Sequence, residues 1–218
     1  MVSLFFKKSL FSKTIGKLSI IGFLSSLGFV MITTIWAVYI NSFVSNMSVV
    51  GFITAFLTFI SFASMFLTVP LIEKSSKSQL FFLSTLLIGI SYLLFYINKN
   101  FYFFILIAVC FSVLRCLKET SFGIIVKNKS YKTTLSRNEG LTYTFMNLAY
   151  VIGPLIAGFA SKIYGANFIF LLAGFFIFIT LLFFKVFKIK NRDIQKKSHK
   201  DFFKNFLSFF KNKDRRVS

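Results

Sequence analysis

Acidic residues, histidine and cysteine are all scarce in this sequence of 218 residues. It contains six Asp and Glu, one His and two Cys. Catalytic and metal-binding sites are commonly built from these side chains, and neither a Gly-rich phosphate loop nor a metal-ligand spacing is present. The lone histidine, His199, lies in a polar tail. We therefore expect a protein that is not an enzyme and that has no metal and no cofactor.

The two cysteines, Cys110 and Cys116, lie six positions apart within one apolar segment. This placement excludes a disulfide framework, and we interpret both residues as small apolar side chains.

The shortage of acids leaves a formal net charge of +20, because 26 Lys and Arg face six Asp and Glu. Such a charge can indicate a nucleic-acid partner when the basic residues share one folded polar face. Here they lie between long apolar runs instead. We therefore expect no nucleic-acid partner.

Apolar residues are abundant: 56% of the chain is hydrophobic, 34 residues are Phe and the mean hydropathy is +0.76. Six segments approach or exceed the ~20 apolar residues that cross a bilayer as a helix. The alternating pattern of a membrane barrel strand is absent. The sequence predicts an all-α membrane protein whose bundle, residues 18–187, has six transmembrane helices. Their expected ranges are 18–40, 49–72, 80–97, 101–126, 139–162 and 163–187.

The distribution of Lys and Arg predicts how the chain crosses the bilayer. If residues 1–17 are cytoplasmic, 22 Lys and Arg lie on the cytoplasmic side and two, Lys99 and Lys162, lie outside. This asymmetry predicts a multi-pass protein of the inner cell membrane with both termini in the cytoplasm. The basic tail, 188–218, contains a short amphipathic segment at about 201–211, which is expected to lie as a helix on the cytoplasmic lipid surface.

The fifth segment is preceded by Ser136-Arg137-Asn138-Glu139, which has the spacing of a capping box. In that motif the serine and the glutamate satisfy free amide groups at the start of a helix. We therefore predict a structural role for Glu139.

Polar side chains within membrane spans are costly, so each is a candidate for function. In the fourth segment Arg115 and Glu119 are one helical turn apart and are expected to form an ion pair, with Lys118 beside them. This group either lines a substrate or ion pathway or locks two helices together. The other candidates for the pathway are Asn147, Tyr150, Tyr143 and Thr34.

Two motifs make the chain resemble the N-terminal half of a major facilitator superfamily transporter. Between the second and third spans the family carries G-x-x-x-D-R-x-G-R-R, and this sequence has VPLIEKSSKS at positions 69–78. Glu73 stands for the acid, and Lys74 and Lys77 stand for basic residues. The resemblance implies that these three residues belong to a charge network that latches the cytoplasmic gate.

The family's antiporter motif, G-x-x-x-G-P-x-x-G-G, is matched in the fifth span. The matching residues are Ala149, Gly153, Pro154, Ala157 and Gly158. Small residues four apart share one face of a helix and let a neighbouring helix approach closely. A bend is expected at Pro154.

The resemblance implies a secondary active transporter that moves a small molecule by alternating access, and the motif in the fifth span favours export by antiport. Family members have twelve helices in two halves, and this chain supplies six. The sequence leaves open a fragment, one part of a split transporter, or a half that dimerises. Transport requires a second six-helix half, from a homodimer or a separate chain. The alternative function is a non-transporting membrane fragment or scaffold whose polar residues serve helix packing.

Overall fold

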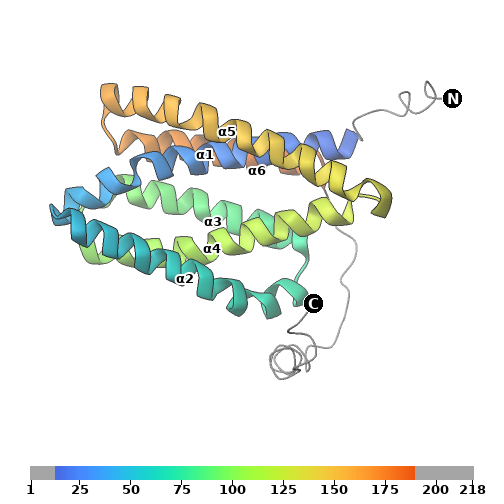
Figure 1. The fold of residues 1–218 in the computed structure, drawn as a ribbon, viewed down its shortest axis with the longest axis horizontal. Coiled ribbons are helices and arrows are strands. Elements are labelled where there is room, and N and C mark those ends of the chain that lie inside the picture. The colour runs from blue at the N-terminus through green and yellow to red at the C-terminus, as the bar shows by residue number, and fades with distance from the viewer. Residues whose placement is uncertain (1–12, 190–218) are drawn as a thin grey trace, which may run out of the picture.

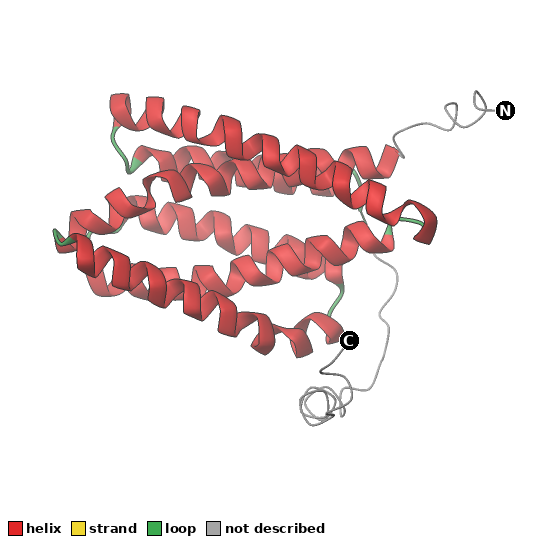
Figure 2. Ribbon diagram, viewed as in Figure 1, coloured by secondary structure: helices red, strands yellow, loops and turns green. Residues whose placement is uncertain are grey.

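The computed structural model describes residues 13–189, which form six long α-helices and one short 3-10 helix (Figure 1). Every connection between the helices is short and lies at one of the two ends of the bundle (Figure 2). All six helices are long and apolar enough to cross a membrane, so the predicted all-α membrane fold with six spans is confirmed. The helices are α1 (Lys13–Val44), α2 (Met47–Lys74), α3 (Lys77–Ile97), α4 (Phe101–Asn128), α5 (Leu135–Tyr164) and α6 (Phe168–Val186); the 3-10 helix, η2, is Lys132–Thr134.

Local signals in the sequence explain several helix ends. Asn46 and Asn100 each precede a helix, and their side chains accept hydrogen bonds from the first free amides of α2 and α4. Gly165 ends α5 with a φ of 85°, a conformation that glycine adopts without strain. Because this turn follows Tyr164, α6 begins at Phe168 and not at 163 as the hydropathy pattern suggested.

The predicted capping box is wrong. Helix α5 already begins at Leu135, so Ser136 lies inside its first turn. The residue at the N-cap is Thr134, and its side chain makes no capping hydrogen bond. Glu139 consequently has no capping role and is free to face another part of the bundle.

The helices pack in the order α5, α1, α6, α3, α4, α2, which puts α5 and α2 on opposite edges of the bundle (Figure 1). If α1, α2 and α3 are exchanged with α4, α5 and α6 respectively, the same packing order results, read from the other edge. The pair α1·α5 then corresponds to α4·α2, and α1·α6 corresponds to α4·α3. The bundle therefore has the contact pattern of two three-helix repeats, an arrangement known in transporter folds.

The apolar core is divided between the two ends of the bundle. At one end the ring of Tyr39 contacts that of Phe170 edge to face with centroids 4.6 Å apart, and the Tyr39 hydroxyl donates to the carbonyl of Phe95 over 2.7 Å. At the other end Ile15 of α1 packs in one cluster with Phe184 of α6. The start of α1 and the end of α6 therefore lie at the same end of the bundle, as Figure 1 also shows.

Most basic residues of the described region flank this same end, whereas Lys99 and Lys162 flank the opposite one. Which end faces the cytoplasm stays a prediction from the charge asymmetry. Residues 1–12 and 190–218 lie outside the described region, and with them His199 and the predicted amphipathic segment 201–211.

Helices α2 and α5 are much less covered than the other four. In the 18-residue apolar stretch of each helix, 22% of α2 and 17% of α5 are buried inside the bundle, against 72% of α1. Large apolar side chains such as Phe59 on α2 and Phe159 on α5 are 67% and 72% exposed. These two edge helices therefore present apolar surface to lipid or to another membrane-embedded protein.

Candidate functional site

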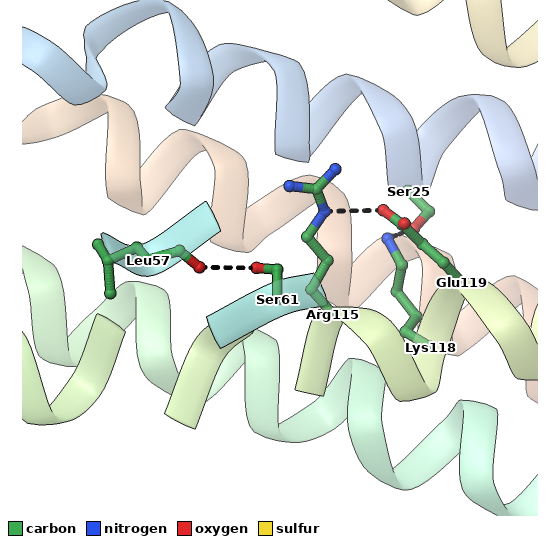
Figure 3. Close-up of polar contacts among 6 residues, drawn as sticks. All are labelled: Ser25, Leu57, Ser61, Arg115, Lys118 and Glu119. Carbon is green, nitrogen blue, oxygen red and sulfur yellow. Dashed lines mark hydrogen bonds and ion pairs between the residues drawn. The ribbon is translucent and has the colours of Figure 1, made fainter. Parts of the chain in front are cut away.

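Three charged residues of α4, Arg115, Lys118 and Glu119, lie in the middle of the bundle, where they face α1 (Figure 3). Arg115 Nε donates to Glu119 Oε1 over 2.9 Å, so the pair predicted from their i, i+4 spacing forms an ion pair. Neither side chain is fully buried: 37% of Arg115 and 45% of Glu119 are exposed. The ion pair thus borders an open space within the bundle.

The guanidinium of Arg115 also lies over the ring of Phe29 on α1. The central carbon of the guanidinium is 3.9 Å from the ring centroid, which is a close cation–π contact. Arginine suits this position because its flat guanidinium can stack on a ring while its edge donates to a carboxylate. Arg115 thereby connects α4 to α1 at about half the depth of the bundle.

Lys118 is the most buried charged residue of this group, with 7% of its surface exposed. Its ammonium donates to the hydroxyl of Ser25 on α1 over 2.9 Å. Figure 3 shows the two groups meeting next to the Glu119 carboxylate. This neutral oxygen satisfies one of the three ammonium donors but supplies no counter-charge.

A cavity of about 320 Å³ lies between α1, α4 and α5, on the side of the bundle where the described chain begins and ends. Six of the seven residues predicted for the pathway line it: Arg115, Lys118, Glu119, Tyr143, Asn147 and Tyr150. We call this space the inner cavity. Its walls combine charged and hydroxyl groups with aromatic rings, which is typical of a site that binds small molecules.

Glu139 also lines the inner cavity, a position that the capping-box interpretation missed. It shares one face of α5 with Tyr143, Asn147 and Tyr150, because successive spacings of four, four and three residues follow the helical repeat. This spacing was the signal in the sequence that would have identified Glu139 as a lining residue.

A second cavity, of about 280 Å³, lies between α1, α2 and α4 toward the opposite end of the bundle. We call it the outer cavity. Two residues, Phe29 and Arg115, line both cavities, so their cation–π contact stands at the junction between them. Ser61 of the outer cavity donates to the carbonyl of Leu57 within α2 (Figure 3).

Thr34 is the one predicted pathway residue that lines neither cavity. Its neighbour Thr33 lines the outer cavity, and both hydroxyls donate to the carbonyl of Val30 over 2.9 Å. One residue further along a helix turns the side chain by about 100°, which carries Thr34 away from the cavity.

The small residues of the motif in α5 face α1. Ala149, Gly153 and Ala157 are buried, and a Cβ atom added to Gly153 would lie 2.9 Å from Val30 Cγ1. Gly158 points elsewhere and has no such neighbour within 4 Å. Pro154 lies within α5, which continues as one helix from Leu135 to Tyr164.

Glu73, Lys74 and Lys77 lie where α2 ends and α3 begins. Lys77 donates its ammonium protons to the backbone carbonyls of Ile72, Glu73 and Ser75, and so it caps the end of α2. Lys74 is exposed in the last turn of the same helix. A gate network built from Glu73, Lys74 and Lys77 remains a prediction that involves a second half.

Comparisons with known proteins agree with this architecture. A model of the Major Facilitator Superfamily matches residues 18–215 of the chain. No curated protein sequence matches it significantly.

Solved structures of transporters share the fold. The crystal structure of the peptide transporter POT in complex with sulfate superposes with a TM-score of 0.76 at 17% identity, over 91% of this chain and 43% of that one. A POT family transporter in complex with a thioalcohol-conjugated peptide gives 0.71 at 16%, over 91% and 44%. The human organic anion transporter MFSD10 (TETRAN) gives 0.62 at 13%, over 83% and 50%. The chain thus spans half or less of the length of these transporters.

Proposed function

The chain belongs to the Major Facilitator Superfamily, and on that premise we propose that it forms one six-helix half of a secondary transporter that moves a small molecule by alternating access. In this family each half packs against another, and the substrate is held near the middle of the membrane between them. The proposed transporter needs no catalytic group, in keeping with a function that is not enzymatic.

The observation that carries this proposal is the polar inner cavity in an otherwise apolar bundle. Arg115, Lys118 and Glu119 place three charges within the spans, where each charge is costly. If these residues served only to lock helices together, they would be closed off by close packing. They instead border an open cavity of about 320 Å³, which is large enough for a small organic molecule.

The exposed edge helices support a second half as partner. Both α2 and α5 border a cavity, the outer and the inner one respectively, and both carry uncovered apolar side chains. A second six-helix bundle that covers these edges would close the cavities on their open side. This bundle is either a second copy of the chain or a separate C-terminal half.

The finer features of the proposed transporter come from sequence. The excess of Lys and Arg at one end supports an inner-membrane protein with both termini in the cytoplasm. The motif of small residues in α5 supports export by antiport. Glu73, Lys74 and Lys77 lie on the cytoplasmic side in this orientation, which supports a role in a gate network with a partner half.

A transport assay with matched variants tests the proposal. The purified chain is reconstituted in liposomes loaded with a mixture of small metabolites, and the loss of each is followed by mass spectrometry. We expect efflux of at least one metabolite, strongly reduced in Arg115→Gln and Glu119→Gln. Lys162→Gln is the control. It removes a charge in the last turn of α5, far from the inner cavity, and should transport normally.

Cross-linking in the same liposomes measures whether the chain forms dimers. A monomeric chain that moves no metabolite contradicts transport by this chain alone. If the chain transports and both α4 variants transport normally while unfolding more readily, the residues serve packing, as the scaffold alternative holds.

A further inference from the structure

The ammonium of Lys118 is buried, and the one carboxylate beside it, that of Glu119, is shared with Arg115, so two cations face a single negative charge. Its one polar contact there is the Ser25 hydroxyl, and the nearest carboxylate in sequence, that of Glu119, is bonded to Arg115. Burying a charge costs several kcal/mol unless an opposite charge compensates it. Because Lys118 borders the inner cavity, a ligand in that cavity can supply the compensation.

Arg115 offers further donors to the same space. The guanidinium has five N–H groups, and the structure uses one of them, on Nε, for Glu119. Figure 3 shows the two terminal nitrogens directed away from the Glu119 carboxylate. They make no hydrogen bond to any residue within 13–189, so they can take a ligand without breaking the ion pair.

The other charge on the cavity wall lies at a different depth. Glu139 is four residues from the start of α5, about 6 Å along the helix, whereas Lys118 is ten residues from the end of α4, about 15 Å. Both distances run from the same end of the bundle. The deep part of the cavity thus holds two cations and one carboxylate, and Glu139 lies nearer the end of the bundle where the described chain begins.

From this geometry we propose that the inner cavity binds a small organic anion, a carboxylate or phosphonate, whose charged group lies between Lys118 and Arg115. Aromatic rings of Phe29 and Phe122 border the same space and provide contacts for an apolar body. A cavity of about 150 Å³ can hold benzene, so 320 Å³ accommodates a ring with its acidic group. The inference rests on the proposed transport function and names the substrate class for it.

Binding of three probes of similar shape and different charge tests the inference. Benzoate, benzamide and benzylammonium are titrated calorimetrically into the full chain in nanodiscs of zwitterionic phosphatidylcholine. We expect benzoate to bind and the other two to bind at least about tenfold more weakly, because an ion pair with a buried charge is lost. Lys118→Gln, which keeps a donor for Ser25, should weaken benzoate binding at least about tenfold, whereas Lys162→Gln should not change it.

A second measurement guards against a variant that does not fold. Benzoate should raise the thermal unfolding temperature of the unaltered chain and of Lys162→Gln, but not that of Lys118→Gln, since a ligand stabilises only the state that binds it. A Lys118→Gln chain that unfolds cooperatively and binds benzoate normally overturns the inference.

Other outcomes separate this inference from the transport proposal. Preferred binding of benzamide or benzylammonium overturns the anion site and leaves a transporter of another substrate class. Failure of all three probes, together with no efflux in liposomes, contradicts both. The titration is repeated with phosphatidylglycerol in the nanodiscs; if that lipid abolishes benzoate binding, the site belongs to a lipid headgroup and the inference is wrong.

Discussion

Replacement of Gly153 by alanine should destabilise the contact between α5 and α1. The added Cβ would lie 2.9 Å from Val30 Cγ1 and 3.2 Å from Val30 Cβ, well inside the ~3.5–4.0 Å at which carbon atoms attract each other. Val30 cannot turn away easily, because the two methyl groups on its Cβ leave one strongly preferred χ1 rotamer within a helix. Forcing one methyl into such a packed contact costs about 1–3 kcal/mol.

Gly158→Ala is the matched control for this prediction. It lies on the same helix, and an added Cβ there meets no atom within 4 Å. Both substitutions gain the same helix propensity, about 0.5–1 kcal/mol in a soluble helix, so the difference between the variants reports the packing cost alone. We expect Gly153→Ala to be less stable than Gly158→Ala by about 1–3 kcal/mol in equilibrium unfolding with SDS in mixed micelles.

A double-mutant cycle with Val30→Ala tests the stated cause. Removing the methyl groups of Val30 removes the closer of the two contacts, so Gly153→Ala should cost less in that background. If Gly153→Ala and Gly158→Ala are equally stable, or if the cost persists without the Val30 methyls, the proposed close approach of α5 and α1 is refuted.

Three further substitutions address other contacts. Tyr39→Phe removes a buried hydrogen bond to the carbonyl of Phe95 and should cost about 1 kcal/mol in the same unfolding assay; a loss near zero would show that the bond contributes nothing. Lys77→Met removes the cap of α2, a contact that stabilises the helix end by about 0.3–1 kcal/mol. Hydrogen exchange of the amides in the last turn of α2 should therefore become roughly twofold to fivefold faster, while exchange in α3 stays unchanged. Phe29→Leu should cost about 0.5–2 kcal/mol through loss of the cation–π contact, and an equal cost in an Arg115→Met background would contradict that origin.

The spans were predictable because membrane helices carry their signal in length and composition. Each of the six described α-helices coincides with one of the six apolar segments, and no tertiary information is needed to see them. The boundary between the fifth and sixth spans was harder, because the turn around Gly165 contains few polar residues and so barely changes the hydropathy. The glycine itself was the remaining signal for the turn.

Contacts within one helix were predictable, whereas contacts between helices were not. The ion pair of Arg115 and Glu119 follows from their spacing alone. The partner of Lys118 is Ser25, 93 positions earlier, and that contact depends on how α1 and α4 are aligned in depth. Hydropathy does not determine this alignment, so neither Ser25 nor Phe29 was identified as part of the site.

Glu139 shows how a local motif can mislead. Its spacing from Ser136 fits a capping box, but the same residue continues a polar stripe along α5. The two interpretations differ only in where the helix begins, and η2 leads directly into α5 two residues earlier than the motif requires. Helix starts are the least certain feature of a sequence pattern, so the periodic stripe was the stronger of the two signals.

The packing order divides the bundle into two closely packed helix pairs that meet at the candidate site. The pairs α1·α5 and α2·α4 are each closely packed, whereas α1 meets α4 only sparsely. At the depth of the cavities, α4 is joined to α1 by the bond from Lys118 to Ser25 and by the stacking of Arg115 on Phe29. The proposed anion would use the remaining donors of Lys118 and Arg115, so it would lie beside both contacts without replacing either. The proposed anion site therefore lies where the two helix pairs meet, at the junction of the inner and outer cavities.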